Sequence, residues 1–137
     1  MIYNVTRTDK NTDREVYNLL GKPFGLLHKL KKGSIGSEPF IIMDCSADFS
    51  IDIQSNDYDR KSNIELRPKG IILHYRKKSS SFIWPIAFRD LIISYSREEL
   101  GISDGRLNVS LKPRVKSKKE SAFVLKMMAN QAAYLDQ

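Results

Sequence analysis

Hydrophobic positions along the chain change from a helical spacing to a strand spacing and then back to a helical spacing. Val16, Leu19 and Leu20 recur at the spacing of one helix face, and Gly21 with Pro23 ends that run. From Pro39 onward apolar and polar residues alternate, which predicts half-buried strands. The last twenty residues return to the helical period. The pattern therefore predicts a helix, a set of strands and a second helix.

The first 36 residues are expected to form a helical extension. The first dozen are polar and predict a frayed lead-in, and residues 12–15 have the Thr-x-x-Glu pattern of a capping box at a helix start. Residues 24–33 form a second apolar segment, in which Phe24, Leu27 and Leu30 share one stripe. Three lysines lie mostly off that stripe, so the segment either packs on the domain or lies on a membrane surface.

Residues 37–137 are expected to form the main domain, which begins with about seven antiparallel strands. A short turn at residues 68–70, a polar reversal at 77–81 and the Asp104-Gly105 pair separate them. Pro85 cannot donate a ladder hydrogen bond, so its strand lies at an edge or a bulge. The predicted strands cover residues 40–43, 49–53, 64–67, 71–75, 82–84, 91–95 and 107–111.

The C-terminal segment predicts an amphipathic helix with a clear start. Residues 117–120 repeat the capping-box pattern, and an apolar run follows them directly. Such a helix needs a surface to cover, and here that surface is the open end or face of the sheet. The fold class is α+β and mostly β. The predicted apolar stripe contains Phe123, Val124, Met127, Met128, Gln131 and Leu135.

Composition places the chain among ordinary globular domains. Its 137 residues predict one compact core, and the single cysteine excludes an internal disulfide framework. No apolar run approaches the ~20 residues that cross a bilayer, and the N-terminus lacks the apolar stretch of a signal peptide. We therefore expect a cytoplasmic protein, with peripheral association with the inner membrane face left open.

Charge is the feature that bears most on function. The formal net charge is +7, yet residues 44–59 contain five aspartates and no basic residue. Basic residues gather instead at residues 60–89 and 106–119. A positive domain attracts anionic partners, which include nucleic acid, anionic lipid and acidic protein surfaces. The alternative is that these charges only keep strand faces and loops solvated.

Candidate catalytic and metal-binding residues are few. A nucleophile needs an orienting base, and here only Cys45 with His28 or His74 offers that chemistry. One cysteine and two histidines at no ligand spacing do not make a zinc site, and no phosphate-cradling glycine motif is present. The sequence predicts no enzyme activity, no metal and no cofactor.

The order of elements resembles the pleckstrin-homology-like (PH-like) superfold, specifically its bacterial branch. The span from about residue 63 to 134 carries the likeness: residues 67–75 are similar to a strand–glycine–strand opening, 82–91 to a hydrophobic strand and turn, and 107–111 to the closing strand before the helix. The resemblance implies a partly open barrel of two orthogonal sheets closed by one helix. It also implies a binding platform, in which Lys and Arg beside the first hairpin hold phosphoinositides in some members.

The resulting hypothesis is a non-enzymatic binding module that recognises a protein partner or an anionic membrane surface through the loop at Arg76. The alternative is a small nucleic-acid-binding barrel that stacks bases on Tyr75 or Trp84. A third hypothesis is an enzyme that uses Cys45. Oligomeric state stays open. The candidate anion- or partner-binding residues are Lys69, Arg76, Lys77, Lys78, Arg114, Lys116, Lys118 and Lys119.

Overall fold

A computed structural model describes residues 1–25 and 35–137 as one antiparallel sheet with helices at both ends of the chain. The sheet is open and has eight strands in the order β1-β5-β4-β3-β2-β8-β7-β6. The elements are β1 (Tyr3–Asn4), α1 (Lys10–Leu20), β2 (Phe40–Cys45), the 3-10 turns η1 (Ala47–Phe49) and η2 (Asp57–Arg60), β3 (Lys61–Arg67), β4 (Gly70–Lys77), β5 (Ser80–Ala87), β6 (Ile92–Ser96), β7 (Glu99–Ser103), β8 (Asn108–Pro113) and α3 (Lys118–Leu135).

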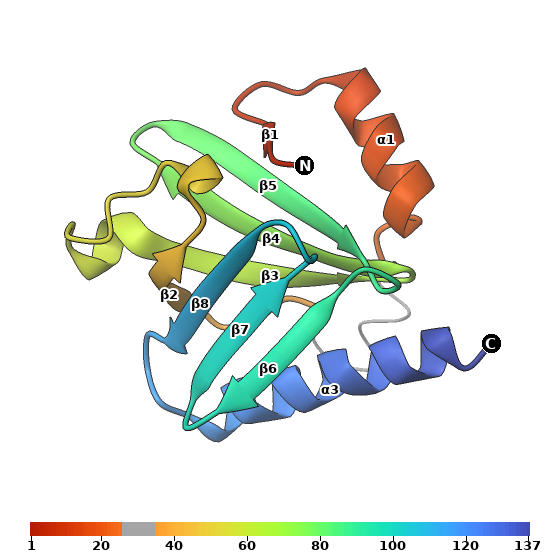
Figure 1. The fold of residues 1–137 in the computed structure, drawn as a ribbon. Helices are drawn as coiled ribbons and strands as arrows, with labels where there is room; N and C mark the ends of the chain where they lie inside the picture. The colour runs from red at the N-terminus through yellow and green to blue at the C-terminus, as the bar shows by residue number, and fades with distance from the viewer. Residues whose placement is uncertain (26–34) are drawn as a thin grey trace.

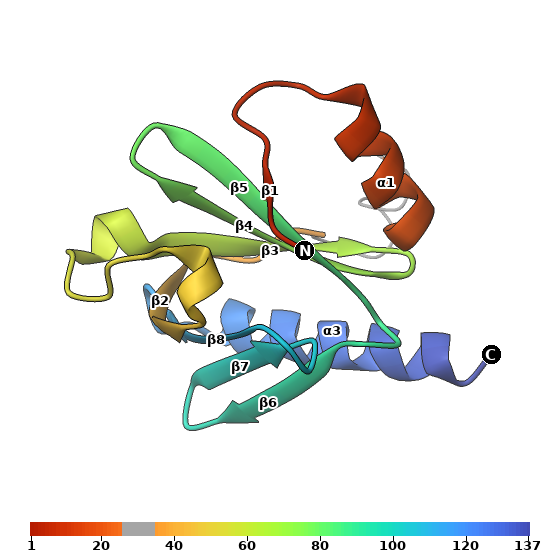
Figure 2. The ribbon, with the colours of Figure 1, turned by 45° about the horizontal axis from the view of Figure 1, so that its top comes forward.

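The sheet consists of two meanders joined by one strand. β2 through β5 form the first and β6 through β8 the second, and β2 pairs with both β3 and β8. Figure 2 shows the two meanders as an upper and a lower layer, with α1 above the upper layer. Buried residues of both layers and of α3, among them Phe40, Trp84 and Met127, form one continuous core.

Two surfaces of the first meander have different roles. Ile71, Leu73 and Tyr75 of β4 face the main core, whereas Ile72 faces the opposite side. We call that opposite side the outer face. α1 covers part of it, because Val16 and Leu20 pack on Ile72, Ile83 and Ala87 in a second, smaller cluster (Figure 1). Burial of such a helix stripe contributes about 1.5–3 kcal/mol per large side chain.

The N-terminal residues differ from the expected frayed lead-in. Tyr3 and Asn4 pair with Ile83 and Phe82 of β5, and the Val5 amide donates to the Ser81 carbonyl at 2.8 Å. The first helix is confirmed, but Asp9 rather than Thr12 caps it, by accepting from the Asn11 amide. The second predicted apolar segment lies outside the described residues except for Phe24 and Gly25, and the domain boundary at residue 36 stays a prediction.

Most of the predicted strands are present, but the strand predicted at residues 49–53 is wrong. Phe49 ends the 3-10 turn η1 and its ring fills the core, 5.1 Å from Trp84, while Ser50 adopts a left-handed φ of 55°. β7, which the sequence did not predict, supplies Leu100 and Ile102 to the core. Pro85 lies beyond the two residues of β5 that β1 covers, so it occupies a strand edge as predicted.

The C-terminal helix confirms the predicted start at residue 118. Phe123, Val124 and Met127 are buried, and Gln131 donates to the carbonyl oxygens of Phe88 and Leu91. The capping box is wrong in its contacts, because the Ser117 side chain makes no cap hydrogen bond and Glu120 instead accepts from the Tyr95 hydroxyl at 2.9 Å. Neither this helix nor α1 is long and apolar enough to cross a membrane, and no other described helix is.

Candidate functional site

The structure distributes the predicted basic residues over three separate places. Arg76, Lys77 and Lys78 lie where β4 turns into β5, whereas Lys69 lies in the turn at the other end of β4. Seven residue steps along β4 lead from Lys69 to Arg76, which is about 23 Å. The third place is the connection from β8 to α3, which carries Arg114 and Lys116, together with the first turn of α3, which carries Lys118 and Lys119.

The third group is not a free basic cluster. Lys116 forms an ion pair with Glu98 in the β6–β7 turn, with Nζ and Oε1 2.8 Å apart. That carboxylate raises the pKa of the Lys116 ammonium above its ordinary value. The Arg114 amide donates to the Pro39 carbonyl, so this segment is anchored by its backbone. Pro39 also lines a groove around Arg76, and the combination of the Arg76 loop with residues 114–119 in one site stays a prediction.

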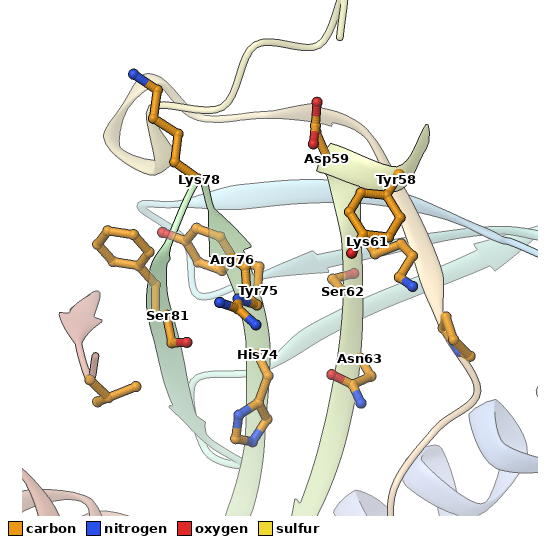
Figure 3. Close-up of a pocket in the computed structure, with 13 residues that line it drawn as sticks. Tyr58, Asp59, Lys61, Ser62, Asn63, His74, Tyr75, Arg76, Lys78 and Ser81 are labelled. Carbon is orange, nitrogen blue, oxygen red and sulfur yellow. The ribbon is translucent and has the colours of Figure 1, made fainter. Parts of the chain in front are cut away.

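A groove of about 600 Å³ occupies the outer face around Arg76. Its floor is formed by β3 and β4, and Val5, Ser81 and η2 border it. Figure 3 shows the Arg76 guanidinium near the centre, between His74 and Ser81, while the Lys78 ammonium points away at the rim. Alternation along β4 explains this placement, because His74 and Arg76 share the outer face while Tyr75 points into the core.

The groove carries positive charge that neighbouring residues leave largely unneutralised. Neither Arg76 nor Lys78 forms an ion pair or hydrogen bond through its side chain with another described residue. Lys61 lies 4.9 Å from the ring centroid of Tyr58, a cation–π contact that positions its ammonium on the groove wall. Asp59 is the carboxylate of the lining. The arrangement suits a compact anionic group rather than a neutral ligand.

A hydrogen-bonded cluster centred on one carboxylate borders the groove on the side of α1. Glu65 accepts from Arg67 Nε at 2.5 Å and lies 2.8 Å from His74 Nε2, and Arg67 also donates to the Gly21 carbonyl. Burial raises the pKa of Glu65, but the hydrogen bonds from His74 and Arg67 outweigh it, so the net shift is downward. The cluster thus ties β3, β4 and the end of α1 together and holds the His74 ring beside Arg76.

We expect Glu65→Gln to lower the free energy of unfolding at pH 7 by about 1–2 kcal/mol, since it weakens two charge-assisted hydrogen bonds. Because the folded pKa is depressed, the stabilisation is present above the ordinary value of 4.5 and is lost as pH falls through the folded value. Urea unfolding at pH 7 and pH 3 measures this, and the difference from wild type should shrink at pH 3. Glu38→Gln, at an exposed carboxylate, is the control; equal losses in both variants would contradict the assignment.

Tyr75 and Trp84 are not available for base stacking. The Tyr75 ring stacks on Phe82, with centroids 5.3 Å apart, and Trp84 is 0% exposed. Burial, followed by the nearby Cys45, raises the pKa of Tyr75 to about 12. The exposed ring beside the groove belongs instead to Tyr58. The prediction that Tyr75 or Trp84 stacks on bases, which belongs to the nucleic-acid hypothesis, is therefore wrong.

The Cys45 thiol has no catalytic arrangement with His74. Cys45 packs against the main core near Tyr75, whereas His74 lies on the outer face. Burial and then the Asp44 carboxylate raise the pKa of the thiol, which disfavours the nucleophilic thiolate. His28 lies outside the described residues. Over residues 1–25 and 35–137, no three His, Cys, Asp or Glu side chains gather as metal ligands do.

Among the groove residues that the sequence analysis missed are Tyr58, Lys61, Asn63 and Ser81. The two-residue turn between Arg67 and Gly70 fixes a register in which Asn63 pairs with His74 and Ser62 with Tyr75. That register brings Lys61 beside Arg76, and the turn residues alone were enough to deduce it. Comparison with protein-family models, with curated proteins and with solved structures gives no match.

Proposed function

We propose that this protein is a non-enzymatic binding module whose outer-face groove takes an anionic group, a carboxylate or a phosphate, of a protein partner. The observation that carries the proposal is Arg76, an exposed guanidinium at the centre of the groove that the described residues leave unpaired. A guanidinium offers a planar fork of donors that matches a carboxylate or phosphate in two parallel hydrogen bonds. Lys61 and the polar side chains of Asn63 and Ser81 supply further donors around it.

The distribution of negative charge favours a protein partner over a membrane surface. Asp59 lies in the lining of the groove, and Asp57 lies beside it on η2 with its side chain 75% exposed. A flat anionic surface that approached Arg76 would also meet these carboxylates, and like charges repel. A single acidic side chain or phosphate that enters the groove meets fewer of these charges, because Asp59 lines the groove and Asp57 does not. The groove therefore supports recognition of one discrete anionic group.

The strand order supports a PH-like fold as the scaffold of this module. A four-stranded meander, a three-stranded meander and a C-terminal helix against both follow the order that the resemblance implies. β1 and α1 are additions on the outer face, next to the groove. Because fold does not assign a ligand, the functional proposal depends on the groove and not on this likeness.

Binding of a labelled hexaglutamate peptide at about 0.15 M salt tests the proposal. We expect Arg76→Ser to weaken binding about tenfold, since one charge-assisted pair is worth about 1.5 kcal/mol. Replacing Arg76, Lys77 and Lys78 together by Ser should abolish it. Lys69→Ser is the matched control, because it removes the same charge from an exposed position about 23 Å away, and its affinity should change less than twofold.

Four outcomes contradict the proposal. Unchanged affinity in the triple variant contradicts the groove as the site. Equal losses in the Lys69 and Arg76 variants show an effect of net charge alone. Binding to anionic but not neutral vesicles, without binding to hexaglutamate, assigns the module to membrane surfaces. Tight binding to oligonucleotides with a steep salt dependence revives the nucleic-acid hypothesis.

A further inference from the structure

α3 carries an apolar face that points away from the domain. Its inner face is buried, yet Leu125 is 62% exposed, and Ala122, Ala129 and Ala132 on the same side of the helix are exposed as well. Between residues 121 and 135 the helix has a single charged residue, Lys126. A surface helix ordinarily shows polar side chains to water, and a helix that is apolar on both sides is ordinarily covered on both.

The exposed face has the spacing of a helix-pairing seam. Six exposed positions follow one another at intervals of four, three, four, three and four residues, which is the a/d period of a coiled coil. The middle four are apolar, and the two ends carry opposite charges. These six positions, which we call the α3 seam, are Lys118, Ala122, Leu125, Ala129, Ala132 and Asp136.

We propose that the α3 seam pairs with the same seam of a second copy of this chain, in antiparallel orientation. In this pair a twofold axis passes at the level of Met127, so two residues lie opposite each other when their numbers add up to 254. Lys118 then lies opposite Asp136 at both ends of the pair, and Leu125 lies opposite Ala129. The pairing is isologous, as symmetric dimers require.

Charge selects this orientation over the parallel one. A parallel pair in register sets Lys118 against Lys118 and Asp136 against Asp136, which repel. The antiparallel pair replaces both repulsions by attractions and also opposes the two helix dipoles. The alanines allow the helix axes to approach closely, toward the lower end of the usual 8–10 Å, while Leu125 fills the space beside Ala129.

The length of α3 sets the expected affinity of the dimer. Eighteen residues span about 27 Å, so one helix pair gives an interface at the small end of the range for specific association. We expect a dimer with a Kd of the order of 10 μM, in which each copy leaves its outer-face groove free. The inference is independent of the proposed function, because the seam and the groove share no residue.

Sedimentation equilibrium of the full chain from about 1 to 300 μM tests the proposal, with a shift from monomer to twice the monomer mass as the expected result. Leu125→Glu should abolish the shift, because it buries a charge in the seam. Val115→Glu makes the same change at another exposed aliphatic residue, 70% exposed and outside the seam, and should have no effect. Circular dichroism checks that each variant keeps its helix content.

A charge swap tests the orientation. Lys118→Asp sets aspartate against Asp136 and should weaken the dimer at least fivefold, and Asp136→Lys added to it should restore the wild-type Kd. Both changes also suit the helix dipole, so the double variant keeps a stable helix. A chain that stays monomeric at 300 μM overturns the proposal, and so does a double variant as weak as the single one.

Discussion

Gly70→Ala is expected to lower the free energy of unfolding by about 3 kcal/mol, at the upper end of the cost of overpacking a core. A Cβ at residue 70 overlaps the Ile86 carbonyl oxygen and lies 2.6 Å from Cδ2 of Leu20 and 3.0 Å from Cα of Ala87. Two of these atoms are backbone atoms of β5, which the ladder with β4 holds in place. Leu20, the last residue of α1, is fully buried between that helix and the sheet.

Urea unfolding followed by circular dichroism measures this loss, and Gly36→Ala provides the matched control. No heavy atom lies within 4 Å of a Cβ built at Gly36, so the same substitution there should change stability by less than about 0.5 kcal/mol. If the two variants unfold at the same urea concentration, the close packing of α1 and β5 around Gly70 is wrong. The functional site depends on β5, because Ser81 and Phe82 of that strand line the groove.

Arg60→Met is expected to lower the free energy of unfolding by about 3 kcal/mol. Arg60 lies in the connection from β2 to β3, which contains only short 3-10 turns. The Arg60 guanidinium is 9% exposed and donates to the Ile42 carbonyl at 2.8 Å and to the Ser55 carbonyl at 3.0 Å. Methionine keeps most of the side-chain volume but leaves the carbonyl oxygens of Ile42 and Ser55 without their charged donor. Each lost hydrogen bond to a charged group costs about 1.5–3 kcal/mol of stability. The same loop supplies Tyr58 to the groove, so peptide affinity should fall as well.

The ion pair of Arg60 with Asp57 allows this effect to be separated from surface electrostatics. The two charged groups lie 3.1 Å apart, but the Asp57 side chain is exposed. Exposed pairs contribute less than about 1 kcal/mol, so Asp57→Ala should be a mild change in the same urea experiment. A loss in Asp57→Ala as large as in Arg60→Met would contradict the role assigned to the carbonyl contacts.

Period-two alternation predicted the strands correctly where both faces of the sheet have a clear role. In β4 it separated Ile71, Leu73 and Tyr75 from His74 and Arg76, and the structure confirms that separation. The same alternation misled at residues 49–53. There Phe49 is buried by the core from a 3-10 turn, and the chain around Ser50 turns instead of pairing. The buried Phe49 side chain thus produced an alternating pattern without a strand.

β7 was missed because its turn lacks the usual residues. Arg97 and Glu98 link β6 to β7 with positive φ angles of 51° and 68°, a conformation that glycine and asparagine ordinarily occupy. No glycine or asparagine signalled a hairpin there, whereas Asp104-Gly105 signalled the next one correctly. Lys116 from the β8–α3 connection pairs with Glu98, so a long-range contact supports a turn that the local sequence does not favour.

The candidate site was predicted only in part, because basic residues that are close in sequence can lie far apart in the fold. Arg76 and Lys78 were identified from a basic run, and both line the groove. Lys69 belongs to the same stretch of sequence but lies at the far end of β4. Tyr58 reaches the groove only because Arg60 fixes the loop that carries it, and a contact of that kind leaves no periodic signal. The α3 seam was not predicted because both faces of the helix are apolar, and only the burial seen in the structure tells the outer face from the inner one.

The most direct test of the anion-binding groove is a titration of the ¹⁵N-labelled chain with hexaglutamate, followed by the backbone amide shifts, with hexaglutamine as the neutral control. We expect the largest changes on His74, Arg76, Asn63 and Ser81, and we expect hexaglutamine to leave these amides unchanged. Changes centred on residues 114–119 or on the Lys69 turn, with the amides of β4 around Arg76 unmoved, would contradict this expectation.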